Sequence, residues 1–161
     1  MSTPLLAPAK LHGLQLPNRL AVAPMTRVSA SPEGYANGTM ARYYERFARG
    51  GFGLVITEGI YTDTAYAQGY ARQPGLSDGE QARAWRPVVK AIQGAGGRVI
   101  AQLMHAGALS QFNRFRDHTV GPSAVRPLGT QMTAYRGEGD YPEPRAMTDA
   151  DIAEAIRGFA R

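Results

Sequence analysis

The residue types that most often carry catalysis form no self-contained set in this sequence. Its three histidines, His12, His105 and His118, have neither metal-ligand spacing nor a paired carboxylate in the sequence. Ser110 and Ser123 lack the strand, turn and helix context of an activated serine, and a lone serine in a loop is more often a turn or surface residue. The sequence therefore predicts neither a metal site nor hydrolase chemistry.

Polar or conformationally special residues instead follow three apolar segments that have the pattern of strands. Pro24, Met25 and Thr26 end the first segment, the pair Glu58-Gly59 follows the second, and residues 102–105 end the third. In parallel α/β folds the carboxyl ends of the strands form the rim at which ligands bind. We therefore interpret these residues as the rim of a ligand site.

Gln102 interrupts an otherwise apolar strand, residues 98–104. An unpaired buried amide there would cost about 1 to 3 kcal/mol, so its side chain needs a partner. A neighbouring backbone group is one candidate. The other is a planar heterocycle with an imide edge, which a glutamine amide matches with both a donor and an acceptor. Chemistry alone leaves the two open.

The elements that would position these residues alternate between strand and helix patterns. Residues 10–20 read as a short hairpin, residues 20–24, 53–57 and 98–104 as buried strands, and residues 39–49 as a helix that stops at two glycines. Ser77 and Glu80 form a capping-box pattern ahead of a second helix, which ends near 94–97.

The last part of the chain combines a long connection with a third helix. The connection after residue 104 runs for about 40 residues, far beyond the usual loop length, which indicates a functional loop. Thr148 and Asp151 form another capping pattern, and we expect Asp149 and Asp151 to complement the helix dipole rather than to act as a catalytic pair. This helix pattern reaches Arg161 without a stop signal.

Three successive strand and helix units without a repeat or a linker predict a parallel α/β architecture. A doubly wound nucleotide-binding sheet would place a glycine-rich turn directly after its first strand, where this chain has Pro24, Met25 and Thr26. This difference favours a (β/α)8 TIM barrel. Because such a barrel takes about 250 residues, we expect residues 1–161 to be the N-terminal portion of a single barrel domain, with a hairpin and the first three units.

Composition narrows the class of protein. The 161 residues carry a formal net charge of +5, but the arginines are scattered without interleaved aromatic residues, so no nucleic-acid partner is expected. No apolar run approaches the ~20 residues of a membrane span, and the chain contains no cysteine from which a disulfide could form. The first residues, MSTPLLAPAK, show no signal-peptide pattern, so the expected location is cytoplasmic.

A series of short motifs runs in order along nearly the whole chain: Asn18-Arg19, 23–27 (APMTR), Tyr43-Tyr44, 51–54 (GFGL), 57–59 (TEG), Gly69-Tyr70, Pro74-Gly75, 102–107 (QLMHAG), 121–124 (GPSA) and Pro144-Arg145. Together these motifs resemble the Old Yellow Enzyme family of FMN-dependent oxidoreductases. Any one of these matches is weak, whereas this many in order is a strong signal. Their order also agrees with the strands assigned independently.

The resemblance implies a flavin site on the predicted rim. Pro24, Met25 and Thr26 would lie along the isoalloxazine ring of FMN, with the Thr26 hydroxyl near the carbonyl beside N5. Gly59 would let the backbone approach the ring, and Gln102 would pair with its pyrimidine edge. The implied activity is hydride transfer from NADH or NADPH, through flavin N5, to an activated alkene such as an enone.

Two further residues are implied in the substrate pocket. Tyr70 aligns with an aromatic position that lines the pocket in many relatives, and Met104 stands where several relatives have an aromatic pocket residue. Each also has a structural interpretation: Tyr70 as a loop tyrosine that covers the core, and Met104 as a flexible residue that fills a gap in it. Ala108 departs from the family, which often has arginine there, and Thr26 favours the subgroup without cysteine at that position.

The resemblance also implies what the chain lacks. In relatives the carbonyl-anchoring pair, the proton-donating tyrosine and the phosphate-binding loops come after the segment that ends here at Arg161, so no catalytic residue is expected in this chain. A complementary C-terminal half of the barrel is the expected partner, and a homo-oligomer of the whole enzyme stays open. The alternatives are an amine dehydrogenase or dienoyl-CoA reductase on the same scaffold, and a noncatalytic fragment or assembly module.

Overall fold

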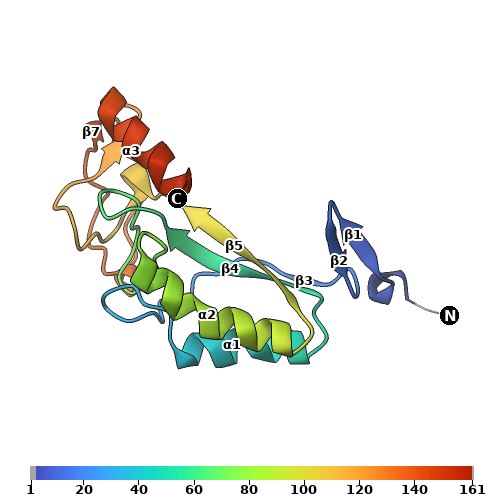
Figure 1. The fold of residues 1–161 in the computed structure, drawn as a ribbon. Helices are drawn as coiled ribbons and strands as arrows, with labels where there is room; N and C mark the ends of the chain where they lie inside the picture. The colour runs from blue at the N-terminus through green and yellow to red at the C-terminus, as the bar shows by residue number, and fades with distance from the viewer. Residues whose placement is uncertain (1–2, 161) are drawn as a thin grey trace.

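The computed structural model describes residues 3–160, which form a parallel three-stranded sheet with helices against one face. Strands β3 (Ala21–Val22), β4 (Leu54–Tyr61) and β5 (Arg98–Met104) lie in the order β3-β4-β5. Helices α1 (Gly38–Arg49) and α2 (Gly79–Gly94) connect them and lie side by side on the same side of the strands (Figure 1). The predicted parallel α/β arrangement is confirmed.

The remaining elements lie at the two ends of this sheet (Figure 1). At the amino ends of the strands are η1 (Pro4–Leu6) and an antiparallel hairpin of β1 (Ala9–Leu11) and β2 (Leu14–Leu16). At the carboxyl ends are η2 (Gly107–Leu109), the parallel pair β6 (Val120–Gly121) and β7 (Arg145–Ala146), η3 (Thr133–Tyr135) and helix α3 (Asp149–Ala160). No helix within residues 3–160 is long and apolar enough to cross a membrane.

The helices begin at side-chain caps, one of them displaced from its predicted position. Asn37 caps α1 by accepting hydrogen bonds from the backbone N–H groups of Thr39 and Met40. Helix α2 is capped by Asp78, which accepts from Gln81 N at 2.8 Å, so the predicted box of Ser77 and Glu80 is wrong by one residue. The Gln81 side chain accepts from Ser77 N at 2.8 Å, one residue before the cap.

The predicted capping box of α3 is confirmed. Asp151 Oδ2 accepts from Thr148 N at 2.8 Å, and Thr148 Oγ1 accepts from Asp151 N at 3.3 Å. Asp151 also pairs with Arg145 at 2.8 Å. This arginine lowers the pKa of the Asp151 carboxyl below its ordinary value. Asp151 therefore has a structural role at the start of α3.

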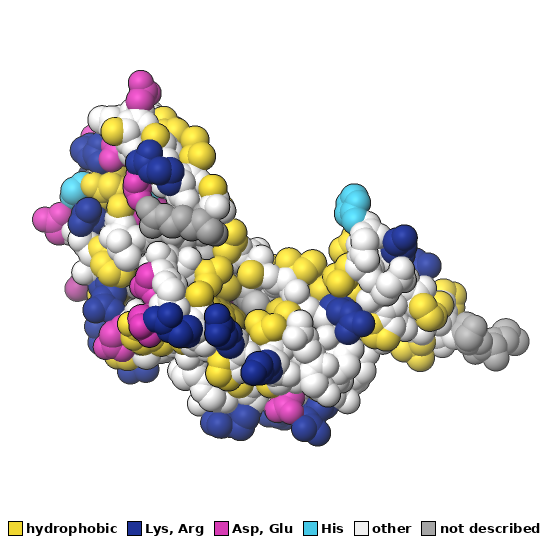
Figure 2. Space-filling view, viewed as in Figure 1, with side chains coloured by type: hydrophobic (Ala, Val, Ile, Leu, Met, Phe, Trp, Pro, Cys, Tyr) yellow, Lys and Arg dark blue, Asp and Glu magenta, His cyan; other side chains and the backbone are white. Residues whose placement is uncertain are grey.

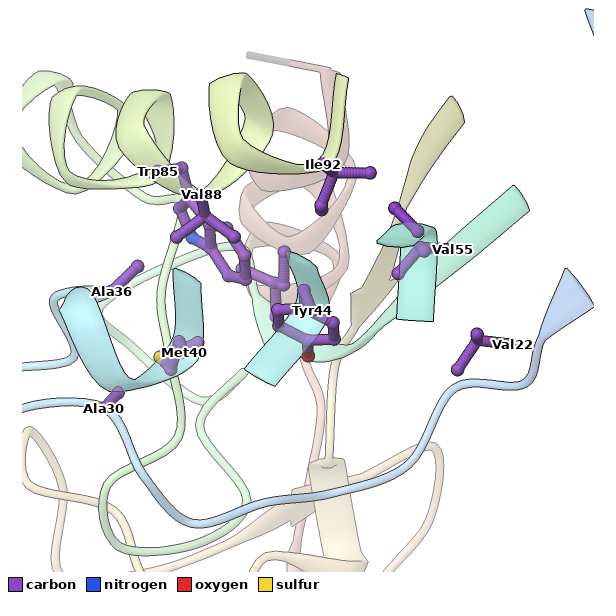
Figure 3. Close-up of a cluster of buried hydrophobic side chains, with 11 residues drawn as sticks. Val22, Ala30, Ala36, Met40, Tyr44, Val55, Trp85, Val88 and Ile92 are labelled. Atoms are coloured by element: carbon purple, nitrogen blue, oxygen red, sulfur yellow. The ribbon is translucent and has the colours of Figure 1, made fainter. Parts of the chain in front are cut away.

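The hydrophobic core lies between the sheet and helices α1 and α2 (Figure 3). It is built from apolar side chains that project from the helices and from one face of the strands: Val22, Val55, Ile60, Met40, Tyr44, Ala48, Trp85, Val88 and Ile92, with Ala30 and Ala36 from the segment before α1. The indole N–H of Trp85 donates to Gly75 O at 3.1 Å, which satisfies the one polar group of that side chain inside the core.

Strand β5 is largely exposed, which corrects one expectation. It was predicted to be buried, yet Ile100 and Leu103 are each 38% exposed, and the side chain of Gln102 is exposed as well. The physical reason is that β5 is an edge strand of the described chain. Figure 2 shows hydrophobic side chains along the hollowed side of the molecule, between the hairpin and α3.

Candidate functional site

The register of the strands brings two of the predicted site residues side by side. Gly59 of β4 pairs with Gln102 of β5, after a register shift between Ile56 and Gly59. The backbone N–H of Gln102 donates to Thr57 Oγ1 at 3.1 Å, which fixes β5 at this irregularity. The glycine and the glutamine therefore meet at the carboxyl ends of neighbouring strands, as the sequence pattern indicated.

The side chain of Gln102 has its full hydrogen-bonding capacity available. It is exposed, and no residue between 3 and 160 makes a hydrogen bond to its amide. The backbone partner considered from the sequence is thus not found within the described chain. One donor pair and one acceptor remain free for a planar ligand with a complementary edge.

Met104 occupies the space beside Gly59. A Cβ added to Gly59 would lie 2.6 Å from Met104 Sδ and 3.3 Å from Met104 Cβ. The Gly59 carbonyl accepts hydrogen bonds from Gln73 Nε2 at 2.9 Å and from the Tyr70 hydroxyl at 3.3 Å. Gln73 Nε2 also lies 3.6 Å from Met104 Sδ. A larger residue at position 59 would collide with Met104, so this position requires glycine. The sequence alone did not reveal this contact.

Tyr70 lies beneath the rim rather than on its surface. It is only 3% exposed, and its ring stacks on Tyr135 with centroids 5.0 Å apart. Its hydroxyl donates to Gly59 O and lies near the side chains of Thr26 and Glu58. Burial raises the pKa of Tyr70 above its ordinary value, so the hydroxyl keeps its proton. Tyr70 links the ends of β3 and β4.

The segment after β3 carries the remaining predicted site residues. Strand β3 pairs with β4 only through Ala21 and Val22, so the chain from Pro24 onward runs free of the sheet. Met25 is 44% exposed, whereas the side chain of Thr26 is half-buried and lies near the Tyr70 hydroxyl. The next residue, Arg27, donates its backbone N–H to Glu58, which places Thr26 close to the end of β4.

Glu58 is a site residue that the sequence reasoning noted at the strand end but gave no role. Its side chain is 0% exposed. The carboxylate accepts from Arg27 N at 3.1 Å and from the Tyr44 hydroxyl at 3.3 Å, while Glu58 N donates to the same hydroxyl at 2.9 Å. Burial raises the pKa of Glu58, and these hydrogen bonds oppose the shift. An acidic residue inside the apolar run LVITEGIY was the available signal.

Backbone strain marks the same region. Val28 has a φ of 53°, in the left-handed region that β-branched residues rarely adopt. Such a conformation costs of order 1 to 3 kcal/mol and persists only where its surroundings hold it. Val28 is held by hydrogen bonds on both sides: Arg27 N donates to Glu58, and Ser29 O accepts from Asn37 Nδ2 at 2.7 Å.

Two histidines lie near carboxylates, which corrects the interpretation made from the sequence. His105 Nε2 lies 3.8 Å from Asp63 Oδ2, and burial lowers the pKa of His105 below its ordinary value despite that carboxylate. His118 Nδ1 lies 2.9 Å from Asp117 Oδ1, and its Nε2 lies 3.1 Å from the Tyr66 hydroxyl. Over residues 3–160 no cluster of His, Asp or Glu is arranged to hold a metal ion.

The fold and the rim together define an α/β protein with a candidate ligand site at the carboxyl ends of parallel strands. The chain belongs to the NADH:flavin oxidoreductase / NADH oxidase family, whose sequence profile matches residues 4–161. This membership confirms the resemblance to Old Yellow Enzymes.

Relatives and solved structures agree with this assignment. The chain is 31% identical to 12-oxophytodienoate reductase 7 of Oryza sativa subsp. japonica over 162 residues, which cover 97% of the chain and 40% of the relative. It superposes with a TM-score of 0.83 on the old yellow enzyme homologue from Zymomonas mobilis, at 29% identity, with 98% of this chain and 43% of that chain covered. Morphinone reductase in complex with tetrahydroNAD gives 0.84 at 29% identity, with coverage of 98% and 44%.

The match covers nearly all of this chain but less than half of each relative. The chain spans about 40% of the length of the curated relatives that it matches. Its α/β fold corresponds to the N-terminal part of the Old Yellow Enzyme barrel.

Proposed function

We propose that this chain is the flavin-holding N-terminal portion of an FMN-dependent ene-reductase. It would supply the hairpin and the first three strand and helix units of a (β/α)8 barrel, and a complementary C-terminal half would supply the rest. The coverage of about 40% of each relative and the uncovered edge at β5 support this proposal. Uniting the halves should bury more than about 2,000 Å², as in obligate interfaces, because it joins two parts of one core.

The residues at the rim fit a flavin. FMN bound there would supply reversible hydride chemistry, with NADH or NADPH as the reductant and an activated alkene as the acceptor. Gln102 offers a free donor and acceptor to the imide edge, and Thr26 offers a hydroxyl. Pro24, Met25 and Gly59 would provide apolar and backbone contact, Met25 being the most exposed of the three.

Side chains of this chain would orient and polarise the bound flavin. The Thr26 hydroxyl would donate a hydrogen bond where negative charge develops on the flavin. Tyr70 lies beneath the rim and Met104 beside Gly59, and we propose that both support the substrate side of the pocket. The roles that require a proton donor or a phosphate site fall to the complementary half.

The observation that carries the proposal is the register that places Gly59 beside Gln102, with the Gln102 amide free. In the completed barrel, Gln102→Leu should weaken FMN binding roughly 10-fold to 100-fold, because the imide groups would lose a partner worth about 1 to 3 kcal/mol. Gln93→Leu is a matched control, since Gln93 is an exposed glutamine on α2, away from the rim. FMN titration with equal affinity in both variants would contradict the assignment of Gln102.

A further inference from the structure

A buried carboxylate behind the rim joins three segments that are distant in the sequence. Glu58 Oε2 accepts from the backbone of Arg27 at 3.1 Å, and Glu58 Oε1 accepts from the Tyr44 hydroxyl of α1 at 3.3 Å. The carboxylate thus ties the segment after β3 and strand β4 to a helix of the core.

We propose that Glu58 is a positioning residue that holds the segment carrying Thr26 against the end of β4, and thereby places the Thr26 hydroxyl for the flavin. This inference rests on the proposed function. Glu58 is 0% exposed and both of its oxygens accept hydrogen bonds from the protein, so it acts through Thr26 rather than on the cofactor or the substrate.

The strained backbone next to Arg27 supports this role. Val28 keeps a φ of 53° although its side chain is branched at Cβ. The hydrogen bond from Arg27 N to Glu58 lies on one side of Val28, and the bond from Asn37 to Ser29 O lies on the other. Backbone strain persists only where the surroundings hold it, so loss of the hydrogen bond to Glu58 should allow this segment to change its conformation.

A positioning role of Glu58 and a direct effect of its charge predict opposite changes in the reduction potential of the flavin. A buried negative charge disfavours the electron-rich reduced flavin, so removing it would raise the reduction potential of the flavin. A misplaced Thr26 hydroxyl would stabilise reduced flavin less, which lowers the potential. The sign of the change therefore separates the two explanations.

The first test is a double-mutant cycle in the FMN-loaded protein completed by the rest of the barrel. Glu58→Gln preserves the size of the side chain but offers one acceptor oxygen to two donors. We expect Glu58→Gln to lower the flavin reduction potential, and we expect this shift to disappear when Thr26→Ala is already present. An unchanged or raised potential, or an equal fall in the Thr26→Ala background, overturns the inference.

The second test needs no flavin. In the apoprotein of the same assembly, trypsin cleavage after Arg27 should become roughly 10-fold faster in Glu58→Gln, because losing one hydrogen bond favours local opening by about that factor. Glu80→Gln is the control, since Glu80 is exposed on α2 and pairs with Arg83. Mass spectrometry of the peptide that ends at Arg27 measures the rate, and equal rates in the two variants overturn the inference.

Tyr44→Phe serves if Glu58→Gln does not fold, because it removes the donor to Oε1 and leaves the carboxylate bound to Arg27 N. It should lower the potential and speed cleavage after Arg27 by smaller amounts, and no change in either measurement overturns the inference. The two proposals fail separately. Absence of FMN binding by the unaltered assembly contradicts the proposed function, whereas unchanged cleavage after Arg27 contradicts the role of Glu58.

Discussion

Replacing Gly59 with alanine tests why this strand position is a glycine. The added Cβ would lie 2.6 Å from Met104 Sδ and 3.3 Å from Met104 Cβ, so the methionine must move. Moving it also disturbs its contact with Gln73 Nε2, which lies 3.6 Å from the sulfur. Overpacking of this kind costs about 1 to 3 kcal/mol, and we expect Gly59→Ala to lower the free energy of unfolding by that amount.

A double-mutant cycle measured by urea unfolding identifies the cause. Met104→Ala removes the sulfur, so in that background Gly59→Ala should cost much less, with a coupling free energy of about 1 to 3 kcal/mol between the two sites. Gly94→Ala is the control because a Cβ there meets nothing within 4 Å. Its effect should stay within about 1 kcal/mol, and helix propensity favours alanine. An equal cost of Gly59→Ala in both backgrounds would refute the reasoning.

Three further outcomes are expected. Thr26→Ala should lower the flavin reduction potential and slow reduction by the nicotinamide, because a hydrogen bond to the electron-rich form of the flavin is lost. A redox titration measures the potential, and an unshifted potential counts against the role of Thr26. Tyr70→Phe should destabilise the protein by about 0.5 to 1.5 kcal/mol in urea unfolding, because the buried hydroxyl that donates to Gly59 O is removed; an unchanged unfolding midpoint contradicts this. Burial raises the pKa of Glu58 above its ordinary 4.5, so the folded state holds the proton more tightly than the unfolded state. The free energy of unfolding, measured relative to Glu58→Gln, should therefore fall as the pH rises from about 4.5 through the raised pKa. A difference between the two proteins that does not depend on pH contradicts the assignment.

The order of elements was predictable because it depends on local patterns. Apolar runs flanked by glycine or proline predicted three parallel strands, and helical spacing with glycine stops predicted α1 and α2. The cap of α2 was misplaced because the stretch SDGEQ contains two capping registers one residue apart, and only the observed hydrogen bond to Asp78 separates them. Local sequence cannot decide between such equal alternatives.

The contacts that shape the site were not predictable because they join distant residues. Glu58 meets Arg27 and Tyr44 across 31 and 14 positions, and Met104 packs against Gly59. His105 and Asp63 approach each other only because β4 and β5 are neighbours. The exposure of β5 was missed for another reason: its apolar composition indicates burial, but β5 is an exposed edge strand of the described chain.

Expression of residues 1–161 alone and together with a complementary polypeptide carrying the other five units tests the central claim most directly. Flavin absorbance after desalting, sedimentation and nicotinamide oxidation with an enone are measured on both samples. We expect the isolated chain to associate through its uncovered strand and apolar face and to retain no stoichiometric FMN, whereas the paired chains should bind FMN and reduce the enone. A monomeric isolated chain that holds FMN tightly and reduces the enone by itself would contradict this account.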